Sequence, residues 1–499
     1  MRRAGVLLHP TSLPGEGPCG TLGAGVRAWL DWLVQAECSL WQVLPLHPPG
    51  RDGSPYDSPS AFALDTRMID TADLVAEGLL PRTALLGMPA AREAVDEVGL
   101  AQWHRGGVAQ AARAMLRDQP EAVEDFAAAQ PWARDWARFR ALVDAHGPSG
   151  WWDLPKPYQA RHAGALAAAD RAHGDAIDLE LAAQLLVHRQ WARVRAEAES
   201  RGILIVGDLP MFVARDGAEP WIHRALFRLD GAGRPVPLTG APPDDFAEQG
   251  QVWNNPHYHW PAHQAEGFAW WIARFQTAMA RHDVVRVDHF RGLLAAWEVP
   301  PSGDAREGRF GPSPGHELLR AVQAAVPGLQ AIAEDLGHIT QDVAALRKRV
   351  GWPGLKVLQF GFDGSPDNPY LPPWSSTDWV ATPGTHDNDT SKGWYEAVPE
   401  PVRRRFSDWA GGPHPCPDPA GALIRGAWSS EADWAIATLQ DVLRLGSWAR
   451  MNTPGQRSGC WGWRARALPG AAAAELAEYA RLFGRARDRA SAAGGDEAI

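Results

Sequence analysis

Cysteine is scarce in this sequence. The 499 residues include four cysteines, Cys19, Cys38, Cys416 and Cys460, and no two of them form a Cys-x-x-Cys pair. This wide spacing argues against a disulfide framework and against a zinc site built on paired thiolates. We therefore expect free thiols in a reducing compartment.

Long hydrophobic runs are also missing. The opening segment MRRAGVLLHP has a basic start but only about five apolar residues before His9 and Pro10, which is too few for a signal peptide. No later run approaches the roughly 18 apolar residues of a membrane-spanning helix. We therefore expect a cytoplasmic protein that does not bind membranes.

Charge of one sign is not concentrated anywhere in the chain. The formal net charge is −10, and the Lys and Arg residues are scattered without a basic stripe. Nucleic acid and anionic membrane are therefore not expected as partners. The composition favours a neutral partner, and we expect a monomer.

Motifs for metals and cofactors fail on their details. The stretch DNDTSK (387–392) lacks the glycine of a calcium loop, and His-Glu-x-x-His does not occur. His257 and His259 form one His-x-His pair, which we interpret as loop residues. Residues 15–20 match Gly-x-Gly-x-x-Gly, but Pro18 lies inside the motif and five residues separate it from the preceding strand. We expect neither a metal nor a cofactor.

Tryptophan, by contrast, is abundant, with 25 residues. The indole ring has a large flat face that packs against the C–H faces of sugars as well as it packs in a core. Most of these rings are expected in the core, so the count favours a carbohydrate ligand only slightly.

Short apolar runs recur along the chain, and several end in polar residues. Helical patterns, for example at 25–36 and 317–326, separate most of them, and strands that alternate with helices imply a parallel sheet. Eight such units predict an α/β fold, a (β/α)8 TIM barrel. The eight expected strand segments are 4–12, 39–46, 203–212, 284–290, 330–337, 354–362, 379–389 and 449–455.

Three intervals are too long or too irregular to be simple barrel connections. We expect residues 1–485 to form a single catalytic barrel domain, followed by a tail at 486–499. The predicted insertions beside the barrel mouth are 47–202, the irregular loop 238–261, and 390–440.

The segment VVRVDHFRG (284–292) places charged groups at the end of an apolar strand. Burying an unpaired carboxylate costs several kcal/mol, so either Arg286 and Asp288 form a structural pair or the carboxylate has a chemical task. His289 is expected to be a packing residue. In a TIM barrel the carboxyl ends of the strands meet on one face, where the active site lies. The polar residues expected there are His9, Asp208, Arg286, Asp288, Glu334, His386 and Asp387.

Three carboxylates on one rim suit the chemistry of retaining glycosidases, in which one acts as nucleophile and another as acid and base. Arg286 points to the same face as Asp288 by strand periodicity and would keep it ionised. Glu334 follows the apolar stretch AIA, which would raise its pKa toward the range of a general acid. Asp387 and His386 would bind vicinal sugar hydroxyls.

Nine motifs, in order across nearly the whole chain, closely resemble the 4-α-glucanotransferases known as amylomaltases or disproportionating enzymes. They are HPTSLPG, SLWQVLPL, GSPYDSPSAFA, GDLPMFVA, RVDHFRG, AEDLG, GLKVLQFGF, GTHDNDT and RMNTPG. The resemblance implies a barrel of the α-amylase clan. It also implies retaining transfer of α-1,4-glucan from donor to acceptor without a cofactor.

The resemblance assigns roles by motif. Asp288 would be the nucleophile, Glu334 the acid and base, and Asp387 the residue that binds and distorts the sugar beside the scissile bond. His386 and Arg286 would support this site, Tyr56 would stack on that sugar, and Asp208 would support the site. Three further candidates for binding substrate lie in the loop 238–261: Asp244, Gln251 and Trp253, the last of which fits a sugar platform or a loop core equally well.

The chain departs from the family pattern at its periphery. Asp245 stands where a loop Tyr is usual, Asn254 where Gly is usual, and Pro373 where His is usual, and SAFALDTR lacks the Gly-Asn that normally follows SAFA. These departures concern outer subsites and the choice of acceptor.

Two alternative functions remain open from the sequence. One is an α-glucan hydrolase on the same scaffold, which differs only in whether water or a sugar hydroxyl reaches the glycosyl-enzyme. The other is a non-catalytic glucan-binding protein, which should have lost at least one of the three acids, whereas this chain retains all of them.

Overall fold

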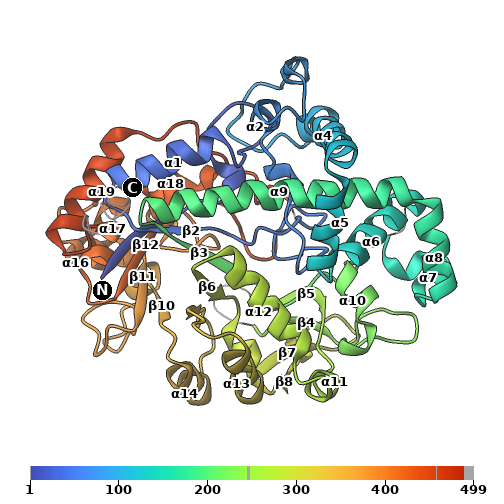
Figure 1. Ribbon diagram of the computed structural model, residues 1–499. Helices are drawn as coiled ribbons and strands as arrows, with labels where there is room; N and C mark the ends of the chain where they lie inside the picture. The colour runs from blue at the N-terminus through green and yellow to red at the C-terminus, as the bar shows by residue number, and fades with distance from the viewer. Residues whose placement is uncertain (1, 148, 244–247, 457, 488–499) are drawn as a thin grey trace.

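The computed structural model describes residues 2–147, 149–243, 248–456 and 458–487. Its centre is a sheet of eight parallel strands in the order β10-β11-β12-β1-β2-β3-β6-β9, which confirms the predicted α/β barrel class (Figure 1). The strands are β1 Arg3–Leu7, β2 Leu40–Gln42, β3 Leu204–Leu209, β6 Val284–Val287, β9 Ala331–Ala333, β10 Gly354–Val357, β11 Trp379–Thr382 and β12 Trp434–Thr438.

Seven of the eight strands lie in the predicted segments, and the eighth does not. We expected it at 449–455, but there the chain forms a short 3-10 turn, Ser447–Ala449, followed by a loop. The eighth strand is β12, which pairs with β11 and β1 and lies inside the range 390–440 that was assigned to an insertion. The apolar run WAIAT is only five residues long, and a run of this length cannot be told from a buried helix segment by its pattern.

Helices surround the barrel and extend far beyond it (Figure 1). The 27-residue helix α9 contacts β3 and α1 of the barrel as well as the helices α4, α5, α6 and α8, so it joins the barrel to the helical segment that precedes it. Helices before β3 are α1 Ala24–Gln35, α2 Thr71–Ala76, α3 Glu97–Gly99, α4 Arg105–Asp118, α5 Pro120–Ala129, α6 Ala133–His146, α7 Lys156–Gln159, α8 Ala163–Ala172 and α9 Gly174–Ser200.

The later helices follow the strands in the alternation expected of the fold, with α15 and α16 added between β11 and β12. They are α10 Ala218–Ile222, α11 Trp260–Ala265, α12 Ala269–Arg281, α13 Gly315–Ala325, α14 Gln341–Val350, α15 Ser391–Ala397, α16 Glu400–Ala410, α17 Pro419–Ser429, α18 Leu439–Val442 and α19 Gly470–Leu482. No helix among the described residues combines the length and the apolar character needed to cross a bilayer.

A second, antiparallel sheet was not predicted. Its order is β5-β4-β7-β8, with β4 Leu238–Ala241, β5 Gln251–Pro256, β7 Ala295–Val299 and β8 Arg309–Pro312. The segment 238–261, which we expected to be an irregular loop, therefore supplies two strands. Pro, Asn and Gly interrupt the alternation of apolar and polar residues that would have signalled them.

Much of the tryptophan content is core. Six indole side chains are almost fully buried: Trp29, Trp41, Trp151, Trp221, Trp271 and Trp428. These six rings serve packing, as we expected of most tryptophans. The number of tryptophans therefore says little about a ligand.

Candidate active site

Arg286 joins the ends of two neighbouring strands. The strand register sets Asp208 of β3 opposite Arg286 of β6. Nη1 of the buried Arg286 donates to Asp208 Oδ2 at 2.7 Å and to Asp288 Oδ1 at 3.1 Å. The guanidinium therefore orients Asp288 at the mouth while Asp208 lies beneath it.

Glu334 lies next to this pair because β9 follows β6 in the sheet. Its Oε2 accepts a hydrogen bond of 2.7 Å from the backbone N–H of His289. Desolvation of the half-buried carboxyl raises the pKa of Glu334 to about 8; Arg286 opposes the rise and Asp288 adds to it. The predicted upward direction is therefore confirmed, and the carboxyl holds a proton near neutral pH.

Asp387 and His386 lie on the loop after β11. Asp387 Oδ1 accepts a 2.6 Å hydrogen bond from Asn452 Nδ2, and its backbone oxygen accepts one of 2.6 Å from Arg450 Nη2. His386 Nε2 lies 3.4 Å from Asp387 Oδ2, and burial lowers the pKa of this histidine. The imidazole is therefore neutral near pH 7, and its Nδ1 has no hydrogen-bond partner among the described residues.

Tyr56 contacts both Asp208 and His386. Its hydroxyl donates to Asp208 Oδ2 at 2.8 Å, and its ring stacks on His386 with centroids 5.1 Å apart and planes at 11°. Burial raises the pKa of Tyr56 well above its usual value, so the hydroxyl remains a donor. The structure thus brings together Asp208, Arg286, Asp288, Glu334, His386 and Asp387, as the strand ends predicted, and Tyr56, which the family resemblance assigned to the site. His9, also expected at the strand ends, lines a small cavity with His47 and Trp461.

Three residues of the segment 449–461 belong to the same surroundings and were not predicted. Besides Asn452 and Arg450, Trp461 lies with its ring centroid 5.6 Å from that of Tyr56 and 5.9 Å from that of His386. Trp461 has a φ of 66°, an unusual left-handed conformation for an aromatic residue. The motif RMNTPG was a signal for this segment, but its interpretation as a strand hid the contacts.

The candidates in the segment 238–261 are only partly described. Trp253 Nε1 donates to Gln251 Oε1 at 3.0 Å, and the Trp253 ring packs edge-on against His289 at 5.1 Å. Trp253 is thus half-buried beside the residue that follows Asp288, and His289 has the packing contact that we expected. Asp244 and Asp245 lie outside the described residues.

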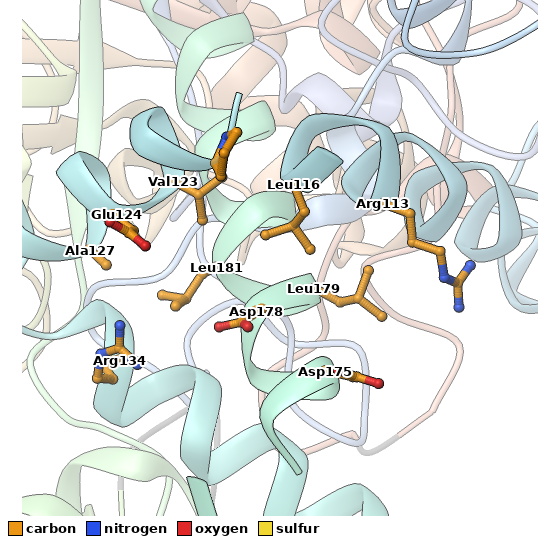
Figure 2. Close-up of a pocket in the computed structure, with 11 residues that line it drawn as sticks. Arg113, Leu116, Val123, Glu124, Ala127, Arg134, Asp175, Asp178, Leu179 and Leu181 are labelled. Carbon is orange, nitrogen blue, oxygen red and sulfur yellow. The ribbon is translucent and has the colours of Figure 1, made fainter. Parts of the chain in front are cut away.

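One groove of the protein surface lies away from the carboxylates. This groove has a volume of about 550 Å³. It is lined by the apolar side chains Leu116, Val123, Leu179 and Leu181 and by charged residues such as Arg113, Arg134 and Asp178 (Figure 2). It lies on α4, α5, α6 and the start of α9 and includes none of the candidate site residues. A cavity of about 20 Å³ lies within the barrel, against Arg286 and His386.

The clustered carboxylates have no metal-ligand geometry: among the described residues, no group of three or more His, Cys, Asp or Glu side chains is arranged to hold an ion. What the arrangement offers is one carboxylate oriented by a guanidinium, one protonated carboxyl, and one carboxylate held by an amide. That set suits acid and nucleophilic catalysis on a neutral substrate.

Comparison with known proteins decides the family. A sequence model described as 4-alpha-glucanotransferase matches residues 8–469. The chain belongs to the 4-alpha-glucanotransferase family. It is 43% identical to the 4-alpha-glucanotransferase of Thermus thermophilus, over 98% of this chain and 99% of that protein. It is also 40% identical to the chloroplastic/amyloplastic 4-alpha-glucanotransferase of Solanum tuberosum, over 93% of this chain and 82% of that protein.

Solved structures agree with the sequence relatives. The amylomaltase of Streptococcus agalactiae, determined in complex with acarbose, superposes with a TM-score of 0.94 at 31% identity and covers 98% of this chain and all of that one. The resemblance seen in the motifs is confirmed. The chain is an enzyme with 4-alpha-glucanotransferase activity, which sets aside the binding-protein alternative.

Proposed function

We propose that the transfer proceeds by double displacement at Asp288. In the first step Asp288 attacks C1 of the sugar beside the scissile α-1,4 bond, and the Glu334 carboxyl gives its proton to the departing glycosidic oxygen. The C1–O bond breaks, a glycosyl ester forms on Asp288, and Glu334 is left as a carboxylate. The observation that carries this assignment is the pairing of an Arg286-oriented Asp288 with a protonated Glu334 on the next strand.

The second step reverses the roles. The 4-OH of an acceptor glucose or glucan attacks C1, Glu334 takes the hydroxyl proton, and the bond to Asp288 breaks, which restores the resting enzyme with retained configuration. The donors and acceptors are α-1,4-glucans and maltooligosaccharides. No cofactor takes part in either step.

The binding residues surround the sugar that is attacked. Asp387 and His386 bind its hydroxyls and favour a distorted ring, and the face of Tyr56 packs against it. Gln251 and Trp253 contact the neighbouring sugar, and the assignment of Asp244 to substrate binding remains a prediction from sequence. Monomeric state, cytoplasmic location, and the division into a 1–485 barrel with insertions and a tail remain predictions.

A trapping experiment tests the assignment. Glu334→Gln cannot protonate a sugar leaving group, but a maltosyl fluoride donor needs no proton to release fluoride. This variant, incubated with the fluoride, should therefore accumulate a maltosyl ester, and mass spectrometry of its peptides should find the ester on Asp288.

The control is Asp288→Asn with the same donor, in which no ester should form. An adduct on another residue, or the same adduct in the Asp288→Asn protein, would assign the nucleophile elsewhere.

A further inference from the structure

The barrel is not closed by a strand ladder all the way round. Among the described residues, β9 and β10 are the two ends of the strand order, and no ladder joins them. One backbone hydrogen bond crosses the gap, from Ala333 N to Pro353 O at 2.9 Å. In a parallel ladder the return bond to Ala333 would come from the N–H of Leu355, two residues beyond Pro353, but this N–H donates to a side chain instead. We call this gap between β9 and β10 the seam.

A side chain spans the seam in place of the missing ladder. Asp335 Oδ1 accepts a hydrogen bond of 2.8 Å from the backbone N–H of Leu355, inside β10. Asp335 Oδ2 lies 3.2 Å from Nε of Arg347, a buried residue of α14, the helix that connects the two strands. One carboxylate thus joins β9, β10 and their connecting helix.

The surroundings leave little room for the carboxylate to move. A Cβ at Gly354 would lie 2.5 Å from Asp335 Oδ2 and 2.7 Å from Trp379 Cζ3, so glycine is needed there. Arg347 is held in turn by Asp378 Oδ2 at 2.9 Å and by the face of Trp379 at 4.2 Å.

Asp335 follows Glu334 directly, and the two side chains bond to opposite neighbours. Glu334 reaches toward β6, where it accepts from His289 N, while Asp335 reaches toward β10. The backbone of Glu334 is also held on the β6 side, by Glu334 N to Val287 O at 3.0 Å. The Asp335 contacts therefore fix the same backbone from the other side.

We propose that Asp335 is a positioning residue for the glucan transfer: it closes the barrel beside Glu334 and thereby holds the Glu334 carboxyl against His289 N. The proposal rests on the role of Glu334 given under the proposed function. Burial raises the pKa of Asp335 to about 6, while the Leu355 N–H and Arg347 oppose the rise, so the carboxylate is mainly charged at pH 7 and above. Its removal leaves the Leu355 N–H without its acceptor and deprives Arg347 of one of its two ion pairs.

The test compares Asp335→Ala with Asp378→Asn by steady-state kinetics on maltotriose over a range of pH. Asp335→Ala should lower kcat roughly tenfold to a hundredfold, because a displaced acid no longer reaches the glycosidic oxygen. KM should change less than about threefold, since the sugar-binding side chains lie on other strands. Asp335→Asn keeps one acceptor for the Leu355 N–H. Its kcat should therefore lie between that of Asp335→Ala and that of the unaltered protein.

The pH profile separates positioning from general stability. If Glu334 moves toward solvent, its pKa falls. The alkaline limb of the pH profile of kcat should then shift to lower pH by about half a pH unit or more. Asp378→Asn removes one charge beside the same arginine but keeps an amide oxygen that can accept from Arg347, the backbone bond to Gly354 N and the Asp335 carboxylate, so kcat and the limb should stay unchanged. Circular dichroism at the assay temperature shows that each variant is folded.

Gly354→Ala is a second route to the same effect, because the added methyl displaces the Asp335 carboxylate while leaving it in the chain. It should lower kcat and shift the limb in the same direction. An Asp335→Ala protein that is folded, with an unchanged kcat and alkaline limb, would overturn the inference, and so would an unchanged Gly354→Ala protein. Near-normal activity of Glu334→Gln would instead refute the proposed function on which the inference depends.

Discussion

Glu334 Oε2 accepts its 2.7 Å hydrogen bond from the backbone N–H of His289, the residue that follows Asp288. The distance from acid to nucleophile is therefore controlled by the backbone at the end of β6. His289 has a φ of 45°, in the left-handed region that most residues avoid. Such local strain persists only where the surroundings hold it, and here Trp253 and Phe212 pack against the imidazole.

The first prediction concerns pH. The folded-state pKa of Glu334 is raised from 4.5 to about 8, so the carboxyl is protonated below pH 8 and loses its proton above it. The general acid is thus present at neutral pH, and kcat/KM on maltotriose should fall as the pH rises through about 8. If activity persists undiminished to about pH 10, deprotonation of Glu334 does not limit the reaction, and the prediction is wrong.

The second prediction separates transfer from hydrolysis. With maltotriose as sole substrate, the enzyme should form glucose together with maltooligosaccharides longer than the substrate, because the covalent intermediate awaits a sugar acceptor. Chromatography of the products after a short incubation measures this. Added glucose should increase the share of short products, whereas a pure hydrolase would yield only shortened chains and would not respond to the acceptor.

The third prediction concerns Asn452, which donates to Asp387 Oδ1. Asn452→Ala removes the amide that orients this carboxylate, so kcat/KM on maltotriose should fall by about tenfold or more. Gln456→Ala is the matched control, because this exposed side chain lies on the same loop and donates to Ser458 O, its one hydrogen-bond partner among the described residues. Its loss should leave kcat/KM unchanged. If the two variants have equal kcat/KM, the Asn452 side chain does not contribute to the function of Asp387.

The fourth prediction concerns Asn254, which stands where Gly is usual. Its φ is 64°, within an irregular stretch of the β4–β5 pairing. Asn tolerates this left-handed conformation better than Ala does, so Asn254→Ala should lower the free energy of unfolding by about 1 kcal/mol. Asn254→Gly should change it by less than about 0.5 kcal/mol. Urea unfolding measures both, and a more stable Asn254→Ala protein would contradict the assignment of strain.

The departure at Asp245 remains a prediction from sequence alone, since this residue lies outside the described part of the chain. A Tyr at that position could stack on a glucan chain, whereas a carboxylate offers hydrogen bonds only. We expect Asp245→Tyr to lower KM for amylose with little change for maltotriose. Steady-state kinetics on both substrates, compared with the unaltered enzyme, will show whether the two KM values respond differently.

The sequence by itself determined the class of fold, the family and the group of residues at the strand ends. Parallel strands place their carboxyl ends on one face, so Asp208, Arg286 and Asp288 could be assigned to one site from periodicity alone. The apolar stretch before Glu334 was enough to predict the direction of its pKa shift, because burial acts through local environment.

The tertiary structure alone decided which strand completes the barrel, how the seam closes and what holds Asp387. The run at Trp434–Thr438 is as short as many buried helix segments, and only its pairing with β1 and β11 identifies it as a strand. The bond from Asn452 to Asp387 joins residues 65 positions apart, and the one from Asp335 to Leu355 depends on a gap in the ladder. Local patterns carry no information about such contacts, because their geometry exists only after the strands have assembled.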